Sequence, residues 1–247
     1  MPLFRFRSLF SLLPVCALVL AMFVVAGCTG GKVRTDAPVA DKEIAPQDSL
    51  RAKFKLTIVQ NGENQELDAV LFSVPGKRYR MELTGPMGIG VASMLWTEEG
   101  WLMTFPTEKL YVKGVGYMVG LLNDRSLPLV HIHQIAAFFE GKLLPDNYED
   151  VVPGHEAVDG TGRHFTYELR DSRVVQLTYT GRDGKPETLK FSGFREFEGN
   201  VLPETIVFER GEKRFLEIKI KKVTHGKSFS GGTWKLNVPR SFKLVEQ

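Results

Sequence analysis

Residues 78–90 read RYRMELTGPMGIG, and this stretch holds the two patterns that decide the fold. In its first half every second residue from Tyr79 to Leu83 is apolar, which predicts a β-strand with one buried and one solvated face. Its second half has three glycines and a proline and predicts a turn. Hairpin loops are normally polar, yet this one carries Met87 and Ile89. These side chains either fold back onto the end of the sheet or contact an apolar surface such as a bilayer.

The same alternation continues on both sides of this stretch. Strands are predicted at 54–58, 67–72, 79–83, 91–97, 101–105, 109–113, 163–169, 174–180, 187–194, 204–209 and 214–223. Between 115 and 140 the apolar residues take helical spacing, and we predict two short helices there, the second beginning near Pro128. The sequence therefore predicts a mainly β domain with a small α insert. Its about eleven antiparallel strands would form an incomplete barrel closed by the short helices.

The concave face of such a sheet would be apolar. It would carry the alternating residues Phe54, Leu56, Tyr79, Met81, Phe105, Phe165, Tyr167, Phe191 and Phe208. A cavity lined in this way suits acyl chains. Periodicity alone favours the simpler alternative, in which these side chains pack against the helices as a dry core.

The N-terminus carries an export pattern. Arg5 and Arg7 precede an apolar run that begins near Leu9, and no acidic residue occurs before Asp36. The run ends in Val25-Ala26-Gly27-Cys28, which matches a bacterial lipobox, where the chain is cleaved before a cysteine whose sulfur carries lipid. The alternative is an uncleaved membrane anchor.

The lipobox defines the predicted domain organisation. Residues 1–27 would be removed as a signal peptide, and Cys28 would be the lipidated N-terminus. Residues 28–47 are rich in glycine, proline and charge and would form a flexible tether. Residues 48–247 would then form a single domain.

Composition narrows the possible functions. The chain has 32 Lys and Arg against 29 Asp and Glu, and removing residues 1–27 takes away two arginines and no acid, leaving 30 against 29. Because the balance is close to neutral, the chain lacks the basic footprint of a nucleic-acid-binding protein. Cys16 and Cys28 both precede the predicted domain, which therefore has no thiol for a disulfide, a metal or a nucleophile.

No catalytic, metal or nucleotide motif is complete. Gly114-Val115-Gly116 lacks the glycine spacing of a dinucleotide loop, and Gly226-Lys227-Ser228 lacks the first glycine of a phosphate loop. His131 and His133 would lie on nearly opposite sides of a helix, so they cannot chelate one metal together. The carboxylates are predicted to lie on solvent faces. We therefore expect no enzymatic activity, no metal and no cofactor.

Three parts of the sequence resemble the outer-membrane lipoprotein receptor family LolB. Residues 79–88 are similar to the family pattern Y-x-L-x-L-x-x-P-L-G. The other similar segments are 119–122, 127–129 and 139–141, in the family's helical region, and 202–206 with 216–220, in its last strand pair. The chain departs from the family at Phe138-Phe139, where a tryptophan is usual, and in its tail, 229–247.

The resemblance implies a function. Members of the family accept lipoproteins from the periplasmic carrier LolA, hold their acyl chains in apolar cavities and insert them into the outer membrane without a nucleotide. Their membrane-facing loop has an exposed leucine, and Met87 matches its position, so Met87 and Ile89 would form a membrane-insertion loop. The resemblance also favours a cavity over a dry core.

The predicted location is the periplasmic face of the outer membrane. Thr29 follows Cys28 in place of the aspartate that signals inner-membrane retention in many enteric bacteria. The protein would be a lipid-anchored monomer whose partners are lipoprotein cargo and a LolA-type carrier. The departures from the family leave an alternative, an envelope lipoprotein that binds free lipid or glycolipid, or has a structural role, without transfer activity.

Overall fold

A computed structural model describes residues 49–60, 62–115, 132–145, 148–152, 156–159, 162–181 and 184–245. The chain divides into two units, Met1–Val39 and Ala40–Gln247, and all described residues belong to the second. The predicted signal peptide, Cys28, the tether and all of the first predicted helix except Val115 lie outside the described residues. Within the described ranges, no helix has the length and hydropathy to cross a membrane.

Most of the described chain forms β-strands. The strands are β1 (Leu50–Gln60), β2 (Glu63–Val74), β3 (Arg78–Thr84), β4 (Gly90–Thr97), β5 (Gly100–Phe105), β6 (Leu110–Gly114), β7 (Glu149–Val152), β8 (Glu156–Val158), β9 (His164–Arg170), β10 (Arg173–Thr180), β11 (Pro186–Ser192), β12 (Arg195–Phe197), β13 (Asn200–Leu202), β14 (Thr205–Arg210), β15 (Lys213–His225) and β16 (Lys243–Leu244). The helical elements are α1 (Ile132–Phe139) and the 3-10 turns η1 (Pro86–Gly88) and η2 (Gly231–Trp234).

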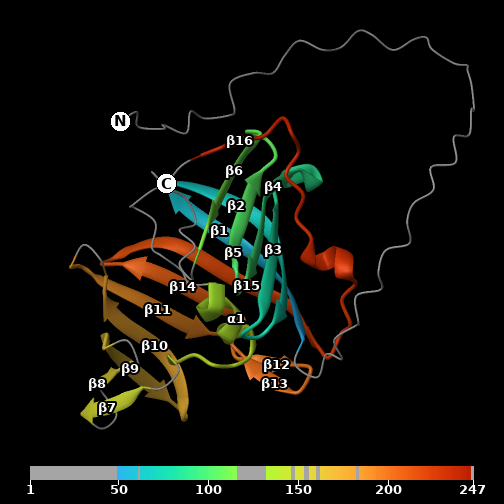
Figure 1. The fold of residues 1–247 in the computed structure, drawn as a ribbon. Helices are drawn as coiled ribbons and strands as arrows, with labels where there is room; N and C mark the ends of the chain where they lie inside the picture. Colours follow the sequence, from blue (N-terminus) through green and yellow to red (C-terminus); the bar gives the residue numbers. More distant parts are fainter. Residues whose placement is uncertain are drawn as a thin grey trace, which may run out of the picture. The chain divides into compact units, whose positions relative to one another are not determined.

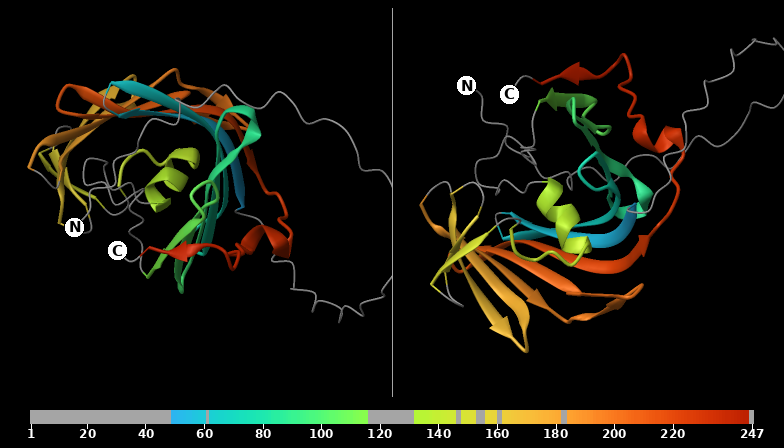
Figure 2. Two further views of the ribbon diagram at one scale, coloured as in Figure 1. Left: turned by 90° about the horizontal axis from the view of Figure 1, so that it is seen from above. Right: turned by 60° about the horizontal axis from the view of Figure 1, so that its bottom comes forward.

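Fourteen strands form one sheet, and β12 and β13 form a separate pair (Figure 1). The order in the large sheet is β16-β6-β5-β4-β3-β2-β1-β15-β14-β11-β10-β9-β8-β7. Every neighbouring pair is antiparallel except β16 on β6. The sheet curves like a trough around α1 (Figure 2). Its two end strands, β16 and β7, do not pair with each other, so the sheet does not close into a barrel. The predicted fold class is confirmed.

Strand β1 lies in the middle of the sheet because it pairs with strands from both halves of the chain. It pairs with β2 along its whole length, from Leu50↔Ser73 to Gln60↔Glu63. On its other side it pairs with β15, with a register shift after Lys53. Two meanders, β1 to β6 and β7 to β15, thereby share one continuous sheet.

The apolar face of this sheet is covered by α1. Ile135, Ala136, Phe138 and Phe139 of the helix are all buried. The ring of Phe139 lies 4.9 Å from that of Phe54 on β1, measured between centroids. Phe138 packs edge-on against Phe191 of β11 and Phe208 of β14, at 5.7 and 6.3 Å. The second predicted helix is confirmed over Ile132–Phe139, and its expected start near Pro128 lies outside the described residues. Its rings hold it on the centre and the C-terminal half of the trough.

The structure has more strands than the about eleven predicted. The additional strands β7, β8, β12, β13 and β16 are each between two and four residues long. A strand this short shows too little alternation to be recognised, and its conformation is decided by the neighbour with which it pairs.

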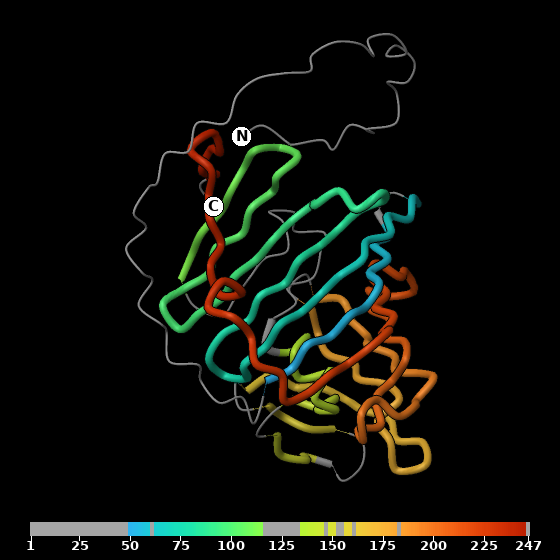
Figure 3. The backbone as a smooth tube through the Cα atoms, turned by 90° about the vertical axis from the view of Figure 1, so that its right-hand side faces the viewer, coloured from blue at the N-terminus to red at the C-terminus, as the bar shows by residue number. Residues whose placement is uncertain are grey.

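The C-terminal segment, residues 226–245, crosses the outer face of the N-terminal half of the sheet (Figure 3). The ring of Phe229 packs edge-on against Phe72 of β2, at 5.4 Å. The guanidinium of Arg78 lies 4.5 Å from the centre of the Trp234 ring. The segment ends as β16, which pairs with β6 and covers the edge that β6 would otherwise expose.

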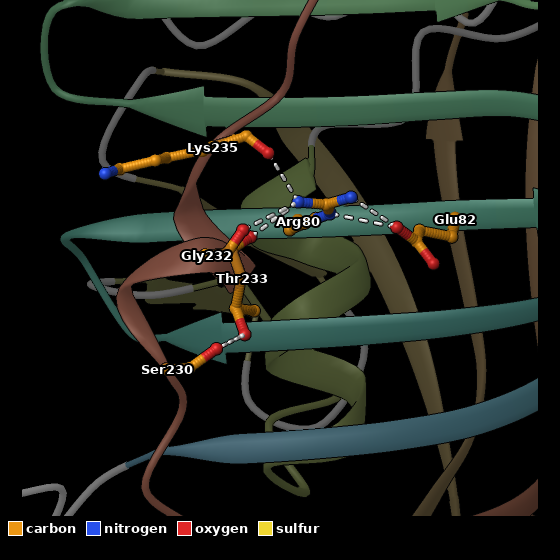
Figure 4. Close-up of polar contacts among 6 residues, drawn as sticks. All are labelled: Arg80, Glu82, Ser230, Gly232, Thr233 and Lys235. Carbon is orange, nitrogen blue, oxygen red and sulfur yellow. Dashed lines mark hydrogen bonds and ion pairs between the residues drawn. The ribbon is translucent and has the colours of Figure 1, made fainter. Parts of the chain in front are cut away.

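Arg80 is the main polar contact between β3 and this segment (Figure 4). Its Nη1 donates to the carbonyl oxygens of Thr233 and Lys235, both at 2.8 Å, and its Nε donates to Glu82 at 3.0 Å. The charged guanidinium is largely buried in this position, with 16% of the side chain exposed. Hydrogen bonds from a charged donor are stronger than neutral ones, so Arg80 is expected to hold the segment in place.

We predict that Arg80→Ala releases the C-terminal segment without unfolding the sheet. Losing the charged hydrogen bonds should lower the local opening free energy by about 2 kcal/mol, so that amide exchange in 230–245 becomes roughly thirtyfold faster. Hydrogen exchange read by mass spectrometry measures this. Arg78→Ala is the matched control, since it removes only a stacking contact worth about 0.5–1 kcal/mol. Equal exchange in the two variants would contradict the role given to Arg80.

Candidate functional site

The loop between β3 and β4 is a closed turn with an apolar tip. The backbone N–H of Gly85 donates to the carbonyl of Ile89 at 2.8 Å, which closes the turn. A Cβ added to Gly85 would lie 3.1 Å from Val91 Cγ2, so the turn leaves little room for a side chain at position 85. Met87 is 93% exposed and Ile89 is 49% exposed. This exposure excludes the alternative in which Met87 folds back onto the end of the sheet.

The backbone of Met87 is also unusual. Its φ is 60° and its ψ is 18°, in the left-handed region that favours glycine. A side chain there costs roughly 1–2 kcal/mol because the Cβ crowds the following carbonyl. Neither backbone preference nor burial accounts for a large apolar residue at this position. Residues in this region cluster at functional sites, although turn residues such as Lys109 and Asp171 of this chain take it too. The exposed apolar side chain, and not the backbone alone, therefore marks the loop as a candidate site.

The structure brings the nine predicted concave-face residues onto one face of the sheet. Eight of them are buried, namely Phe54, Leu56, Tyr79, Met81, Phe165, Tyr167, Phe191 and Phe208. Phe105, near the β16 end of the sheet, is partly buried and packs against the same core. Their role as an acyl-chain lining stays a prediction.

Sequence reasoning did not foresee the ring contacts of Phe138 and Phe139. In the sequence these two residues stand where the LolB family usually has a tryptophan. In the fold they are fully buried and meet Phe54, Phe191 and Phe208. The helical stripe of apolar residues Leu129, Ile132, Ala136 and Phe139 was the available signal. It indicates a buried helix face, but it does not say which strands that face meets.

A polar row with the buried Glu187 at its centre crosses three strands at one end of the C-terminal half. Glu187 of β11 pairs in register with Tyr179 of β10 and Arg210 of β14. Nε and Nη2 of Arg210 donate to Oε1 of Glu187, at 3.0 and 2.6 Å. Burial, together with the Glu187 carboxylate, raises the pKa of Tyr179 above its ordinary value, so its hydroxyl stays protonated.

This row corrects the prediction that the carboxylates lie on solvent faces. Glu187 is 5% exposed and Asp159 is 7% exposed. Each is buried because an arginine reaches it: Arg210 from another strand, and Arg163 through its backbone N–H and its Nε, both at 3.0 Å from Asp159. The partner of Glu187 is 23 residues away, so alternation along one strand cannot reveal it.

The two glycine motifs have structural explanations where they are described. A Cβ on Gly114 would lie 2.6 Å from the Trp101 ring, so that glycine lets an indole lie flat on the backbone. Gly226 donates its N–H to the Ser49 carbonyl at 2.9 Å and begins the C-terminal segment. Gly116, His131 and His155 lie outside the described residues, as does the side chain of His133. Across the described ranges no cluster of three His, Cys, Asp or Glu residues could hold a metal.

Comparisons with known proteins identify the fold. No protein-family model matches the chain, and no curated protein matches it. A DUF1329 family protein from Desulfovibrio piger is 13% identical and superposes over 77% of this chain and 90% of its own, with a TM-score of 0.52. A LolA superfamily protein from Nitrosomonas europaea is 12% identical over 80% of this chain and 94% of its own, with a TM-score of 0.50. The chain has a LolA-like fold.

A third solved structure agrees with this assignment. It is a domain from Vibrio parahaemolyticus named for outer membrane lipoprotein sorting, 9% identical over 76% of this chain and 89% of its own, with a TM-score of 0.50. Identities this low establish the shared fold and no shared activity. The function therefore has to be argued from the site.

We predict that Met87 contributes nothing to stability. Met87→Gly relieves the left-handed strain of about 1–2 kcal/mol and loses about 0.5–1 kcal/mol to the greater freedom of glycine in the unfolded chain. The free energy of unfolding, measured by denaturant titration, should therefore be unchanged or slightly higher. The control is Met81→Ala on β3, the strand that leads into this loop. It removes a buried side chain and should cost about 2–5 kcal/mol. A clear destabilisation by Met87→Gly would show that the exposed side chain has a structural role.

Proposed function

We propose that this protein is a lipid-anchored receptor of the outer membrane that accepts lipoproteins from a LolA-type carrier and inserts them into that membrane. Three observations support the proposal. The fold is shared with a LolA superfamily protein and with a domain named for lipoprotein sorting. The sequence Val25-Ala26-Gly27-Cys28 matches a lipobox, which would provide the anchor. The curved sheet offers a continuous apolar concave face for acyl chains.

The exposed Met87 loop carries the proposal. Moving one such side chain from water into a bilayer is worth roughly 1.5–3 kcal/mol, which allows repeated contact and release. The short turn is closed by the hydrogen bond from Gly85 to Ile89, so little conformational entropy is lost when it inserts. The loop would place the end of the sheet against the membrane, where an acyl chain can move from one apolar phase to another.

This transfer needs no covalent chemistry. An acyl chain gains little free energy on passing from an apolar protein surface into hydrocarbon, so the direction of transfer depends on relative affinity and on the great excess of membrane. We accordingly propose a carrier-type activity without catalytic residues, cofactor or metal.

A second function is favoured by one observation. Phe138 and Phe139 are fully buried and occupy the centre of the concave face, as they would in a protein with a permanently filled core. The protein would then be an envelope lipoprotein that binds free lipid or glycolipid, or acts structurally, without transfer. Native mass spectrometry with carrier-loaded lipoprotein separates the two functions, because only the receptor should acquire an acylated cargo.

We predict that Met87→Glu retains cargo binding and loses insertion. A charged side chain forfeits the bilayer contact, so insertion into outer-membrane vesicles should fall at least about tenfold, as a loss of 1.5–3 kcal/mol implies. The measurement is cargo recovered in floated vesicles after incubation with loaded receptor. Met87→Leu is the matched control and should insert normally, because leucine is apolar and similar in size. Normal insertion by Met87→Glu would refute the role of the loop.

We also predict that the anchor governs the target membrane and not the transfer step. A form without Cys28, exported by a non-lipoprotein signal, keeps the Met87 loop and should still deliver cargo. It should deliver to inner-membrane and outer-membrane vesicles alike, whereas the anchored protein delivers to the membrane in which it resides. Vesicles of both kinds, separated by density after the reaction, measure the distribution. Complete loss of delivery by the unanchored form would show that the anchor takes part in the transfer itself.

A further inference from the structure

Three methionines stand side by side on the concave face of the N-terminal half. Met81 of β3 pairs in register with Met94 of β4, and Met94 pairs with Met103 of β5. Each is 3% exposed, and their alternation places all three on the inner side of the sheet. We call Met81, Met94 and Met103 the methionine row.

The two halves of the trough are built from different side chains. Residues 132–247 contain no methionine at all. Their inner face carries Phe and Tyr rings among buried Leu and Ile side chains, and we call it the aromatic half because these rings contact one another and α1. The contacts are Phe165 with Tyr167, Phe208 with Phe215, and Phe138 with both Phe191 and Phe208. The described ring contacts of α1 reach β1, β11 and β14, and none involves β3, β4 or β5.

This difference decides where side chains of the concave face can move aside for a ligand. A dry face admits an acyl chain only if side chains move aside. Moving a ring of the aromatic half breaks several ring contacts together, each worth roughly 0.5–1.5 kcal/mol beyond its burial. Methionine is unbranched, has three rotatable side-chain bonds and fills irregular spaces in many rotamers, so it can rearrange at lower cost.

The neighbours of the row on β3 and β4 are large rings on one side and smaller side chains on the other. Towards one end Tyr79 pairs with Trp96, their rings 5.5 Å apart, and Trp96 pairs with Trp101. Towards the other end the cross-strand pair is Leu83 and Ala92, both buried and neither of them aromatic. An acyl chain lying across β3, β4 and β5 would therefore contact the flexible thioethers of the row and be bounded on one side by the indole rings.

We propose that the acyl chains of the cargo lie along the methionine row, and that the flexibility of its side chains lets the site accept chains of different length and shape. This inference rests on the proposed receptor function, and it adds the position of the acyl-chain site and the residues that set its selectivity. The aromatic half with α1 then serves as the fixed wall of the trough.

Photo-crosslinking in cells that produce the full-length protein tests the position. Cells grown with a diazirine analogue of methionine insert it at every methionine, and irradiation joins it to whatever lies within contact distance. Peptide mass spectrometry then identifies the adducts. We expect lipoprotein acyl adducts at Met81, Met94 or Met103. Phe191→Met is the matched control, because it places the same probe in the aromatic half, where we expect no such adduct.

The possible outcomes distinguish a failure of the proposed acyl-chain position from a failure of the proposed receptor function. Acyl adducts at Phe191→Met and none in the row would overturn the proposed position and leave the receptor function standing. An absence of acyl adducts at all of these positions, in protein that is folded and exported, would count against both.

A second variant tests the selectivity. Replacing all three methionines by leucine nearly conserves volume but stiffens the lining. The measurement is the affinity for a series of lipopeptides that differ only in acyl-chain length. The ratio of affinities between the best-bound and worst-bound lengths should be several-fold larger for this variant than for the unaltered protein. Equal discrimination by the two proteins would refute a role for methionine flexibility.

Discussion

The pairing of β1 with β15 is the contact on which the rest of the structure depends. It joins the first strand to one that follows it by more than a hundred residues, as in Phe54↔Ile220. Without this pairing the chain would form two separate meanders, each with an exposed edge and half an apolar face. With it, the two halves become one trough, and α1 packs at the junction through Phe139 on Phe54. Such distant pairing requires closure of a long loop, so it is expected to form late in folding.

Strand β3 concentrates the features that bear on function. On its inner side it carries Met81 of the methionine row, and on its outer side Arg80 holds the C-terminal segment. At its end it leads into the loop that presents Met87. The C-terminal segment thus crosses the outer face of the N-terminal half and pairs with part of its edge through β16, while the apolar loop is left exposed. A single strand connects the surface proposed to meet the membrane with the surface proposed to hold the acyl chain.

Much of this could be predicted from the sequence, because the strongest signals are local. The alternation of Tyr79, Met81 and Leu83, and the helical stripe that ends at Phe139, identify the elements and the faces they bury. The path of the C-terminal segment could not be predicted, since it depends on Arg80 meeting carbonyls more than 150 residues away. The burial of Glu187 could not be predicted for the same reason, because its partner Arg210 lies on another strand.

The Met87 loop shows where the boundary lies. By itself the sequence determined that residues 85–90 form a turn with an apolar tip, because glycine and proline act through their own backbone preferences. It likewise determined which residues of each strand are apolar. Only the tertiary structure decided that Met87 takes the left-handed conformation and points into solvent, and that Met81, Met94 and Met103 become neighbours. The physical reason is that exposure and cross-strand contact depend on strand register and on which side chains pack nearby. Both are set by residues that are distant in the chain.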